Sequence, residues 1–350
     1  VEHNYAEGVA GGLHLYDVDA PVVIEETAFD HNTAASGEAG GARIRLTGDG
    51  QILRMDRVWI RNNRADQKAA GLFLDAAGVD SPRALLTNML FAGNATDGNG
   101  DADAVIGIDG GFTSMQVDVA HVTAADNRAP TFLYAAPAGD AGDLLTISLT
   151  NTLLISFTHA FAAEEGTYSD ATIHHRNTLT HNVANLHQTV AGSPVFHAQN
   201  GLAGDPKLNR TYHLEAGSAA IDAGVVAGVL HDIDGQSRPP AGPVDVGADE
   251  YVAVAPTSVT VMGPTTGVVG RTYAFVAAVS PVTATGPFTY TWSPSPDTGQ
   301  GADQATYAWS SPGAKTLTVT AVSTLGTTPP ANHVIALELN KVYLPVVMKE

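Results

Sequence analysis

Cysteine is absent from this chain of 350 residues. Its absence excludes disulfides, thiolate metal sites and a cysteine nucleophile. A secreted scaffold that depends on dense disulfides is therefore excluded. The length leaves room for two or three domains.

Basic residues are scarce, with 17 Lys and Arg against 36 Asp and Glu, which gives a formal net charge of -19. Nucleic-acid binding needs Lys and Arg to neutralise phosphates, so we expect no nucleic-acid partner. The same charge would repel anionic membrane surfaces. The composition fits an acidic surface protein, for which calcium is a candidate cation.

Long apolar runs are also missing. No stretch approaches the ~18 apolar residues of a membrane span, so no transmembrane segment is expected. The polar start Val1-Glu2-His3-Asn4 does not resemble a signal peptide and lies inside the repeat pattern described next. It predicts a mature or processed product.

An asparagine follows an apolar turn about every thirty residues. The segments are Phe29–Asn32, Trp59–Asn62, Phe91–Asn94 and Ala124–Asn127, with His3-Asn4 as an earlier member. A period of a few tens of residues indicates stacked, self-similar units. Short β-rich runs and scarce helical periodicity favour an all-β solenoid. Residues 1–203 are therefore predicted to form a right-handed parallel β-helix, whose strands repeat about 4.8 Å apart along the axis.

The recurring asparagines are predicted to stack at one corner of successive coils. Their amides can bond one another and the turn backbone, and asparagine tolerates the left-handed conformation that such corners need. The predicted ladder is Asn4, Asn32, Asn62, Asn94 and Asn127.

Two segments resemble known families. Phe29 to Asn32, followed by Gly40-Gly41-Ala42, resembles the repeat of polymorphic outer-membrane-type β-helical surface proteins. Residues 204–252 contain Gly217–Gly224, Asp232–Gly235 and Val244–Tyr251, and this string resembles the C-terminal cap of bacterial secreted β-helix proteins, found before varied surface anchors. The resemblance implies a cap over an exposed solenoid end.

A second domain is predicted at residues 257–338, where strand-like runs alternate with Pro and Gly turns. Tyr290-Thr291-Trp292, followed by Pro312 to Val319, resembles a polycystic-kidney-disease (PKD)-type, immunoglobulin-like sandwich, a module that usually serves as a spacer or adhesive unit. The tail, residues 339–350, reads as an apolar strand and resembles the terminal strand of some bacterial secreted proteins. Its candidate assembly residues are Tyr343, Leu344, Pro345, Val346 and Val347.

Calcium has two candidate sites. One loop places oxygen ligands at alternate positions, as calcium loops do, with Asp97, Asn99, Asp101 and Asp103. It lacks the usual glycine and the final acid, so a solvated inter-strand loop is the competing interpretation. Asp232 and Asp234 form the second candidate, against a turn whose Asp side chains bond local backbone.

No catalytic constellation stands out, although parallel β-helices include polysaccharide lyases and glycoside hydrolases. Paired carboxylates for hydrolysis could come from neighbouring coils, and the candidates are Asp30, Asp56, Asp118 and Asp126. A lyase would need a basic proton acceptor, for which Arg57, Arg61 and Arg128 are available. None of these residues is singled out by a motif.

The first hypothesis is a non-enzymatic extracellular structural or adhesive protein. It would be a cell-surface or filament subunit that self-associates through exposed β-helix ends and the C-terminal strand. The alternative is a carbohydrate-active enzyme or a carbohydrate-binding protein on the same fold, with surface glycans as partners. A groove along one β-helix face, lined by carboxylates and aromatic residues, would support the alternative.

Overall fold

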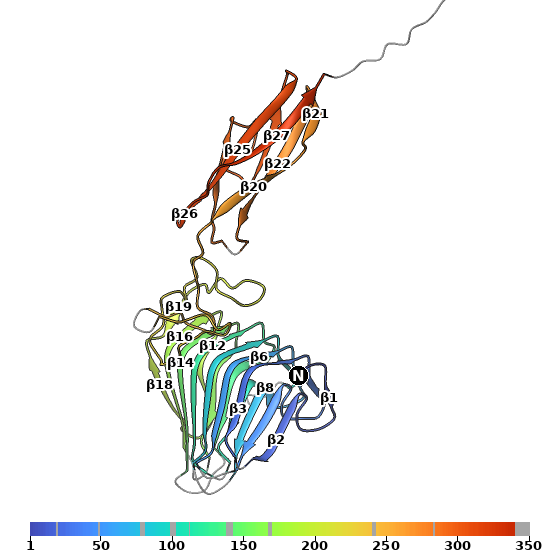
Figure 1. Cartoon of the computed structure of the whole chain (residues 1–350). Coiled ribbons are helices and arrows are strands. Elements are labelled where there is room, and N and C mark those ends of the chain that lie inside the picture. The colour runs from blue at the N-terminus through green and yellow to red at the C-terminus, as the bar shows by residue number, and fades with distance from the viewer. Residues whose placement is uncertain are drawn as a thin grey trace, which may run out of the picture. The chain divides into compact units, whose positions relative to one another are not determined.

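The computed structural model describes residues 1–18, 20–47, 50–77, 81–98, 103–111, 113–137, 143–166, 170–239, 243–282 and 284–339. The chain divides into two compact units, Val1–Tyr251 and Val252–Glu350. The described residues form strands and loops without a helix (Figure 1). Accordingly, none of them belongs to a helix with the length and apolarity of a membrane span.

The first unit is a parallel β-solenoid of about six turns over residues 5–191. A short sheet contains β1 (Tyr5–Ala6), β4 (Thr33–Ala34), β7 (Arg64–Ala65) and β10 (Ala95–Thr96). A second sheet contains β2 (Leu13–Val18), β5 (Ala42–Leu46), β8 (Ala69–Ala76), β11 (Ala104–Asp109), β13 (Thr131–Ala136), β15 (His159–Glu164) and β17 (Asn185–Ala191).

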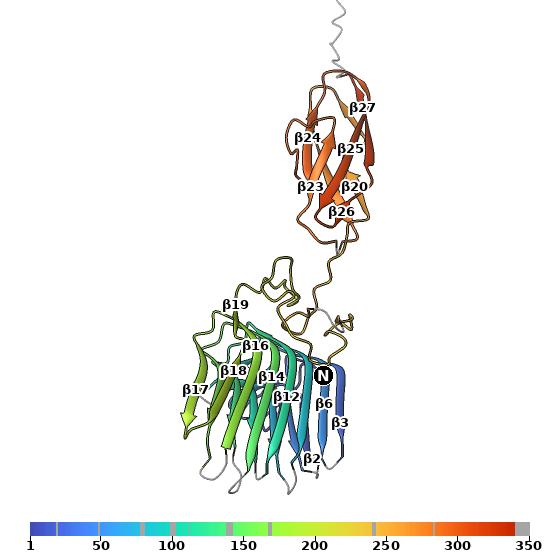
Figure 2. The same ribbon diagram turned by 90° about the vertical axis from the view of Figure 1, so that its left-hand side faces the viewer.

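The third sheet, called the bent sheet below, has the longest strands, which lie side by side in Figure 2. It contains β3 (Val22–Asp30), β6 (Ile52–Arg61), β9 (Arg83–Ala92), β12 (Met115–Ala125), β14 (Leu144–Ile155), β16 (Asp170–His181) and β18 (Val195–Gln199), with β19 (Leu202–Ala203) paired to β16. Each strand pairs in parallel with its counterpart in the next turn, as the repeat predicted.

One residue in the middle of each long strand adopts a left-handed conformation and divides the strand into two halves. These residues form the corner row, with φ between 47° and 57°: Glu26, Arg57, Asn88, His121, Asn151 and Asn177. A left-handed residue turns the chain, so the two halves of the sheet present different outer faces. The first half ends before the corner row and the second half begins after it.

The core is built from inward side chains that stack in register from turn to turn. Phe29, Ile60, Phe91, Ala124 and Leu154 form one such column, and all but Phe29 are fully buried, with Phe29 1% exposed. Small residues allow turns to approach at the entry to the second sheet. A Cβ at Gly40 would collide with the carbonyl oxygen of Ala70, which explains the recurring small-residue pairs.

Residues 204–251 are called the strap below, and the described ones, 204–239 and 243–251, lie along the side of the solenoid. They contact several turns: Asn177 Nδ2 donates to Ala223 O at 2.9 Å, and the Ala248 amide donates to Thr123 Oγ1 at 2.9 Å. The expected end cap is thus corrected to a lateral cover. The reason is that outward positions of the second half are apolar and need burial, and the strap packs on Trp59, Leu90, Leu153 and Leu179.

The second unit has two sheets around one core, an arrangement consistent with a β-sandwich. One sheet contains β20 (Ser258–Met262), β22 (Thr272–Ser280) and β24 (Gln304–Ala308), all antiparallel. The other contains β21 (Thr266–Val268), β23 (Thr289–Ser293), β25 (Gly313–Ser323), β26 (Gly326–Thr327) and β27 (Ala331–Glu338). Trp292, Phe275 and Leu317 lie at the centre of their shared core.

Candidate functional site

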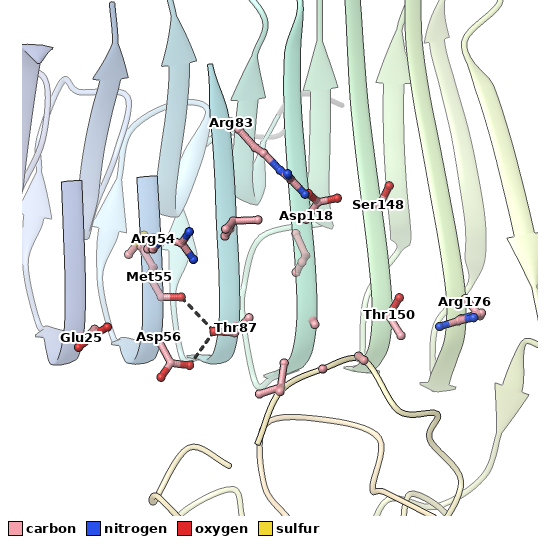
Figure 3. Close-up of a pocket in the computed structure, with 16 residues that line it drawn as sticks. Glu25, Arg54, Met55, Asp56, Arg83, Thr87, Asp118, Ser148, Thr150 and Arg176 are labelled. Atoms are coloured by element: carbon pink, nitrogen blue, oxygen red, sulfur yellow. Dashed lines mark hydrogen bonds and ion pairs between the residues drawn. The ribbon is translucent and has the colours of Figure 1, made fainter. Parts of the chain in front are cut away.

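An open groove of about 590 Å³ lies on the outer face of the first half of the bent sheet (Figure 3). Six neighbouring strands, β3, β6, β9, β12, β14 and β16, contribute its floor, and Ala227, Gly228 and Val229 of the strap line its edge. Since adjacent strands lie about 4.8 Å apart, the five steps from β3 to β16 span roughly 24 Å. The groove is therefore long enough for an extended chain.

Two outward-facing rows of side chains form the floor, one drawn from four of the strands and the other from all six. One row contains Arg54, Leu85, Asp118 and Ser148, and the other contains Glu25, Asp56, Thr87, Ala120, Thr150 and Arg176. The residues between the rows, such as Leu86 and Leu149, point into the core because side chains alternate along a strand. All of the floor residues in the two rows except Leu85 and Ala120 are polar.

Three arginines carry the positive charge of the groove. Arg83 donates from Nε to Asp118 Oδ2 at 2.9 Å and pairs with the same carboxylate through Nη2. Arg54 and Arg176 are exposed, and neither side chain makes a hydrogen bond or ion pair with the described part of the chain. Because β6 and β16 are four strand steps apart, these two guanidinium groups are separated by roughly 19 Å along the axis.

Two of the three groove carboxylates, Asp56 and Asp118, accept hydrogen bonds from the protein itself, whereas the Glu25 carboxylate has no donor among the described residues. Asp56 Oδ1 accepts hydrogen bonds from Thr87 Oγ1 at 2.6 Å and from Asn88 Nδ2 at 2.9 Å. Asp118 accepts hydrogen bonds from Arg83 and, at 3.1 Å, from Gln116 Nε2. Glycoside hydrolysis needs one carboxyl group to protonate the bond and another to attack it or activate water. Among the described residues, Glu25 is thus the one groove carboxylate without a protein donor.

The other carboxylates considered from the sequence lie elsewhere. Asp30 accepts a hydrogen bond from Arg61 Nη2 at 2.8 Å, and Asp126 accepts one from the Tyr212 hydroxyl at 3.2 Å. Both aspartates lie at the ends of second halves, away from the groove floor, so the four candidates do not converge. The arginines suggested as proton acceptors are also absent from the groove lining: Arg57, Arg61 and Arg128.

The asparagine ladder runs through one column of inward-facing amides. Each Nδ2 donates to the Oδ1 of the next asparagine at 2.9–3.0 Å, through Asn4, Asn32, Asn63, Asn94 and Asn127. Each accepting Oδ1 also receives the backbone N–H of the preceding asparagine at 3.0–3.1 Å. Neighbouring turns are thereby joined in their interior.

The predicted ladder member Asn62 is wrong, and Asn63 takes its place. Asn62 occupies the left-handed corner with φ 54°, and its Nδ2 donates to Asp30 Oδ1 at 3.0 Å. The corner residue points outward and the residue after it points inward. Phe29 lies three residues before the ladder residue Asn32. Ile60 is the partner of Phe29 in the next turn, and the residue three positions after Ile60 is Asn63. The same spacing from an apolar residue therefore identifies Asn63 as the ladder member.

Arg238 fastens the strap to the solenoid. Its side chain is 1% exposed and donates to Glu250 Oε2 at 2.6 Å and to the carbonyl oxygen of Ala248 at 2.8 Å. It also reaches Asn88 Oδ1 of the corner row at 3.4 Å. Burial lowers the pKa of Arg238 and raises that of Glu250, while their mutual attraction opposes both shifts.

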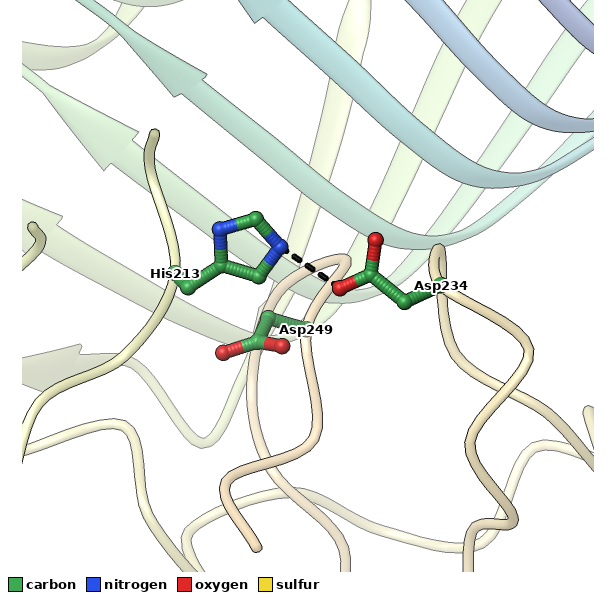
Figure 4. A group of neighbouring side chains, drawn as sticks. All are labelled: His213, Asp234 and Asp249. Carbon is green, nitrogen blue, oxygen red and sulfur yellow. Dashed lines mark hydrogen bonds and ion pairs between the residues drawn. The ribbon is translucent and has the colours of Figure 1, made fainter. Parts of the chain in front are cut away.

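A polar cluster lies within the strap, where His213, Asp234 and Asp249 come together (Figure 4). His213 Nε2 is 2.6 Å from Asp234 Oδ2. Burial, together with the charges of Asp232 and Asp234, raises the pKa of Asp249 to about 6, and the hydrogen bond from the Leu214 amide opposes that rise. Asp234 was a candidate from the sequence, whereas His213 and Asp249 were not, and both lie within residues 204–252, which carried only the family resemblance.

Asp232 has a structural role in its turn. It is fully buried, and its Oδ1 accepts the backbone amides of Asp234 at 3.0 Å and Gln236 at 2.7 Å. Its Oδ2 accepts the Glu250 amide at 3.1 Å. This is the turn interpretation that the sequence left open.

The first calcium candidate is only partly described. Arg64 holds Asp97 through Nε, at 2.8 Å from each carboxylate oxygen, and Asp103 is buried. Asn99 and Asp101 lie outside the described residues. The tail residues predicted to support assembly also lie outside them: Tyr343, Leu344, Pro345, Val346 and Val347.

Comparison with known proteins identifies a similarity to a solved structure. No protein-family model and no curated protein matches the chain. Among solved structures, the chain is similar to the PKD domain of an M14-like peptidase from Thermoplasmatales archaeon SCGC AB-540-F20, at 18% identity and a TM-score of 0.20. The match covers 25% of this chain and 98% of that domain. At this TM-score the likeness supports no conclusion about activity.

Proposed function

We propose that the protein is an extracellular, adhesive glycan-binding protein without catalytic activity, and that its groove binds an extended anionic polysaccharide. The observation that carries the proposal is the continuous polar groove across six strands of one solenoid face. The groove favours the carbohydrate-binding alternative from the sequence analysis. It contains carboxylates, as that alternative required, but its lining includes no aromatic residue among those described.

The ligand class follows from the two unpaired arginines. A planar guanidinium binds a carboxylate or sulfate group through two parallel hydrogen bonds. The guanidinium groups of Arg54 and Arg176 are free to form such bonds, whereas that of Arg83 is already paired with Asp118. Their separation of roughly 19 Å along the axis fits repeated negative groups on a polymer better than one small molecule.

The finer architecture belongs to the same proposal. The repeat and strap signatures support a right-handed winding and a bacterial secreted origin. The Tyr290–Trp292 motif and the two-sheet core support a PKD-type, immunoglobulin-like spacer. Self-association through solenoid ends or the tail stays a prediction of the sequence.

Titration of the full chain with polygalacturonate, a carboxylated polymer, tests the proposal, with dextran as the neutral comparison. The double variant R54Q/R176Q should lose at least about 10-fold in affinity, since two charge-assisted contacts of about 1.5–3 kcal/mol each are removed. The matched control is Arg64→Gln, which removes an exposed arginine on another sheet.

Three results would oppose the proposal. Polygalacturonate could fail to bind, the double variant could bind as well as the control, or dextran could bind equally well. Release of reducing ends or unsaturated products during the titration would replace binding with catalysis.

A further inference from the structure

The strap cluster joins three stretches that are distant in sequence. His213 comes from the first, Asp234 from the turn after Asp232, and Asp249 from the last. One ligand atom from each of the three lies within 4.8 Å of the other two. His213 and Asp234 are partly exposed, while Asp249 is 5% exposed and buried beneath them. Figure 4 shows the three side chains directed toward one space.

Hydrogen bonding determines which nitrogen of His213 carries its proton. Asn209 Oδ1 is fixed as an acceptor, because it receives the backbone amides of Thr211 at 2.8 Å and His213 at 3.1 Å. Thr211 Oγ1 lies 2.8 Å from that oxygen and must donate its single hydroxyl proton to it. His213 Nδ1, at 2.9 Å from Thr211 Oγ1, must then be the donor in that contact.

In neutral His213, Nε2 therefore presents a lone pair. That lone pair faces Asp234 Oδ2 at 2.6 Å, where two acceptors would repel each other. A positive species has to lie between them, and the candidates are a second imidazole proton and a metal cation. A ligating histidine commonly donates its other N–H to an orienting partner, as His213 does to Thr211.

The third carboxylate favours a divalent cation over a proton. Asp249 Oδ2 accepts the Leu214 amide at 2.7 Å, and no described residue donates to its Oδ1. One proton would compensate the charge of a single carboxylate, whereas a divalent ion compensates Asp234 and Asp249 together. The buried Asp232 holds the Asp234 amide and thereby supports the ligand from behind.

We propose that His213 Nε2, Asp234 and Asp249 bind a divalent metal ion of the zinc class within the strap. An imidazole and two carboxylates suit zinc, whereas calcium prefers an all-oxygen shell. Ligands of a tetrahedral zinc ion lie roughly 3.3 Å apart, so His213 and Asp234 move apart by roughly 0.7 Å on binding. Both side chains have the exposure to do so. The ion joins three stretches of the strap and leaves room for water as a further ligand.

The test titrates the EDTA-treated full chain with zinc chloride, by calorimetry and by 15N–1H spectra of the imidazoles. We expect one ion per chain and a shift of His213 Nε2, with Nδ1 keeping its proton. His213→Gln and Asp234→Asn should each weaken binding at least about 10-fold, a loss typical even of outer-shell partners. Exposed controls, His14→Gln and Asp170→Asn, should bind zinc as the parent does.

The variants are chosen so that folding does not obscure the result. His213 and Asp234 are partly exposed, whereas Asp249 supports the Leu214 amide and is left intact. Circular dichroism of each apo variant should match the parent. Absence of zinc binding would overturn the site, as would unchanged affinity in both variants. Saturation by calcium without any His213 shift would overturn the zinc class. None of these outcomes depends on the groove.

Discussion

At the scale of single residues, the corners determine which side chains face the interior. A residue with positive φ directs its side chain outward, and the next residue enters the column, as with His31 and Asn32 or Asn62 and Asn63. An error of one position therefore moves a side chain from the interior to the surface. The amides of Asn32, Asn63, Asn94 and Asn127 are buried and hydrogen-bonded, so they are expected to matter for stability.

Asn63→Ala should destabilise the solenoid by about 3 kcal/mol, because Asn94 and the Phe29 carbonyl lose buried partners. Asn62→Gly is the matched control, since glycine accepts φ 54° and the exposed bond to Asp30 contributes little. Urea denaturation of both variants provides the measurement. Equal losses in the two variants would contradict the corrected ladder.

Acid should destabilise the protein through His121. Burial, assisted by the nearby charge of Arg238, lowers the pKa of His121 from 6.5 to about 3. The unfolded imidazole binds a proton below pH 6.5 and the folded one does not until pH 3, so stability falls as the pH falls through this window. Between pH 6.5 and 4.5 the loss is about 2 to 3 kcal/mol.

His121→Asn should reduce this acid loss, since asparagine occupies the equivalent corner position at Asn88 and Asn151. Urea unfolding at pH 7.5 and 4.5 measures the difference, with the exposed His14→Asn as the control. A pH dependence that is the same in both variants would show that His121 titrates normally in the folded state.

At the scale of elements, the bent sheet has two outer faces, and the strap covers one of them. The strap buries the apolar second half and leaves the polar first half as the groove, which it also borders. Arg238 is the main polar connection, because it joins Glu250, Ala248 and Asn88. A buried charge that loses its partner is costly, so the connection is sensitive to single substitutions.

Arg238→Met should cost about 3 to 5 kcal/mol by leaving Glu250 buried and unpaired. The strap segments should then exchange amide hydrogens faster, while the second sheet of the solenoid keeps its protection. Arg210→Met, an exposed change in the same strap, should remain within about 0.5 kcal/mol of the parent. Unaltered exchange in Arg238→Met would show that the strap is held mainly by its apolar contacts.

Much of the element pattern was predictable from the sequence, and the site was not. Strands at Val22, Val117 and Leu144 follow from β-branched runs, and the repeat period predicted their parallel stacking. The groove depends on the register that brings Arg54, Asp118 and Arg176 onto one face. The loops between their strands differ in length, so the repeat period gives that register only approximately. The path of the strap depends on outward residues such as Trp59 and Leu153, which carry no local signal of what covers them.

At the scale of the whole molecule, the two units have separate cores. Among the described residues, the solenoid core and the sandwich core share no member, and Trp292, Phe275 and Leu317 belong to the core of the second unit. Independent cores predict independent unfolding transitions. The groove and the strap cluster both belong to the first unit, so ligand binding there should not require the second.

Leu317→Ala should lower one calorimetric transition of the full chain and leave the other unchanged. Leu317 is fully buried, and its truncation costs about 2 to 5 kcal/mol, or roughly 10 °C or more for a unit of this size. Leu325→Ala, an exposed change in the same unit, serves as the control. A simultaneous shift of both transitions would show that the units unfold together.

The central claim is that a polymer lies along the groove, and a hydrogen-exchange footprint of the full chain with an acidic oligogalacturonate tests it most directly. The account predicts slower exchange at residues 52–56, 83–87, 116–120, 148–150 and 174–176, together with the bordering strap residues 227–229. Unchanged exchange in these segments, or protection confined to residues 257–338, would contradict it.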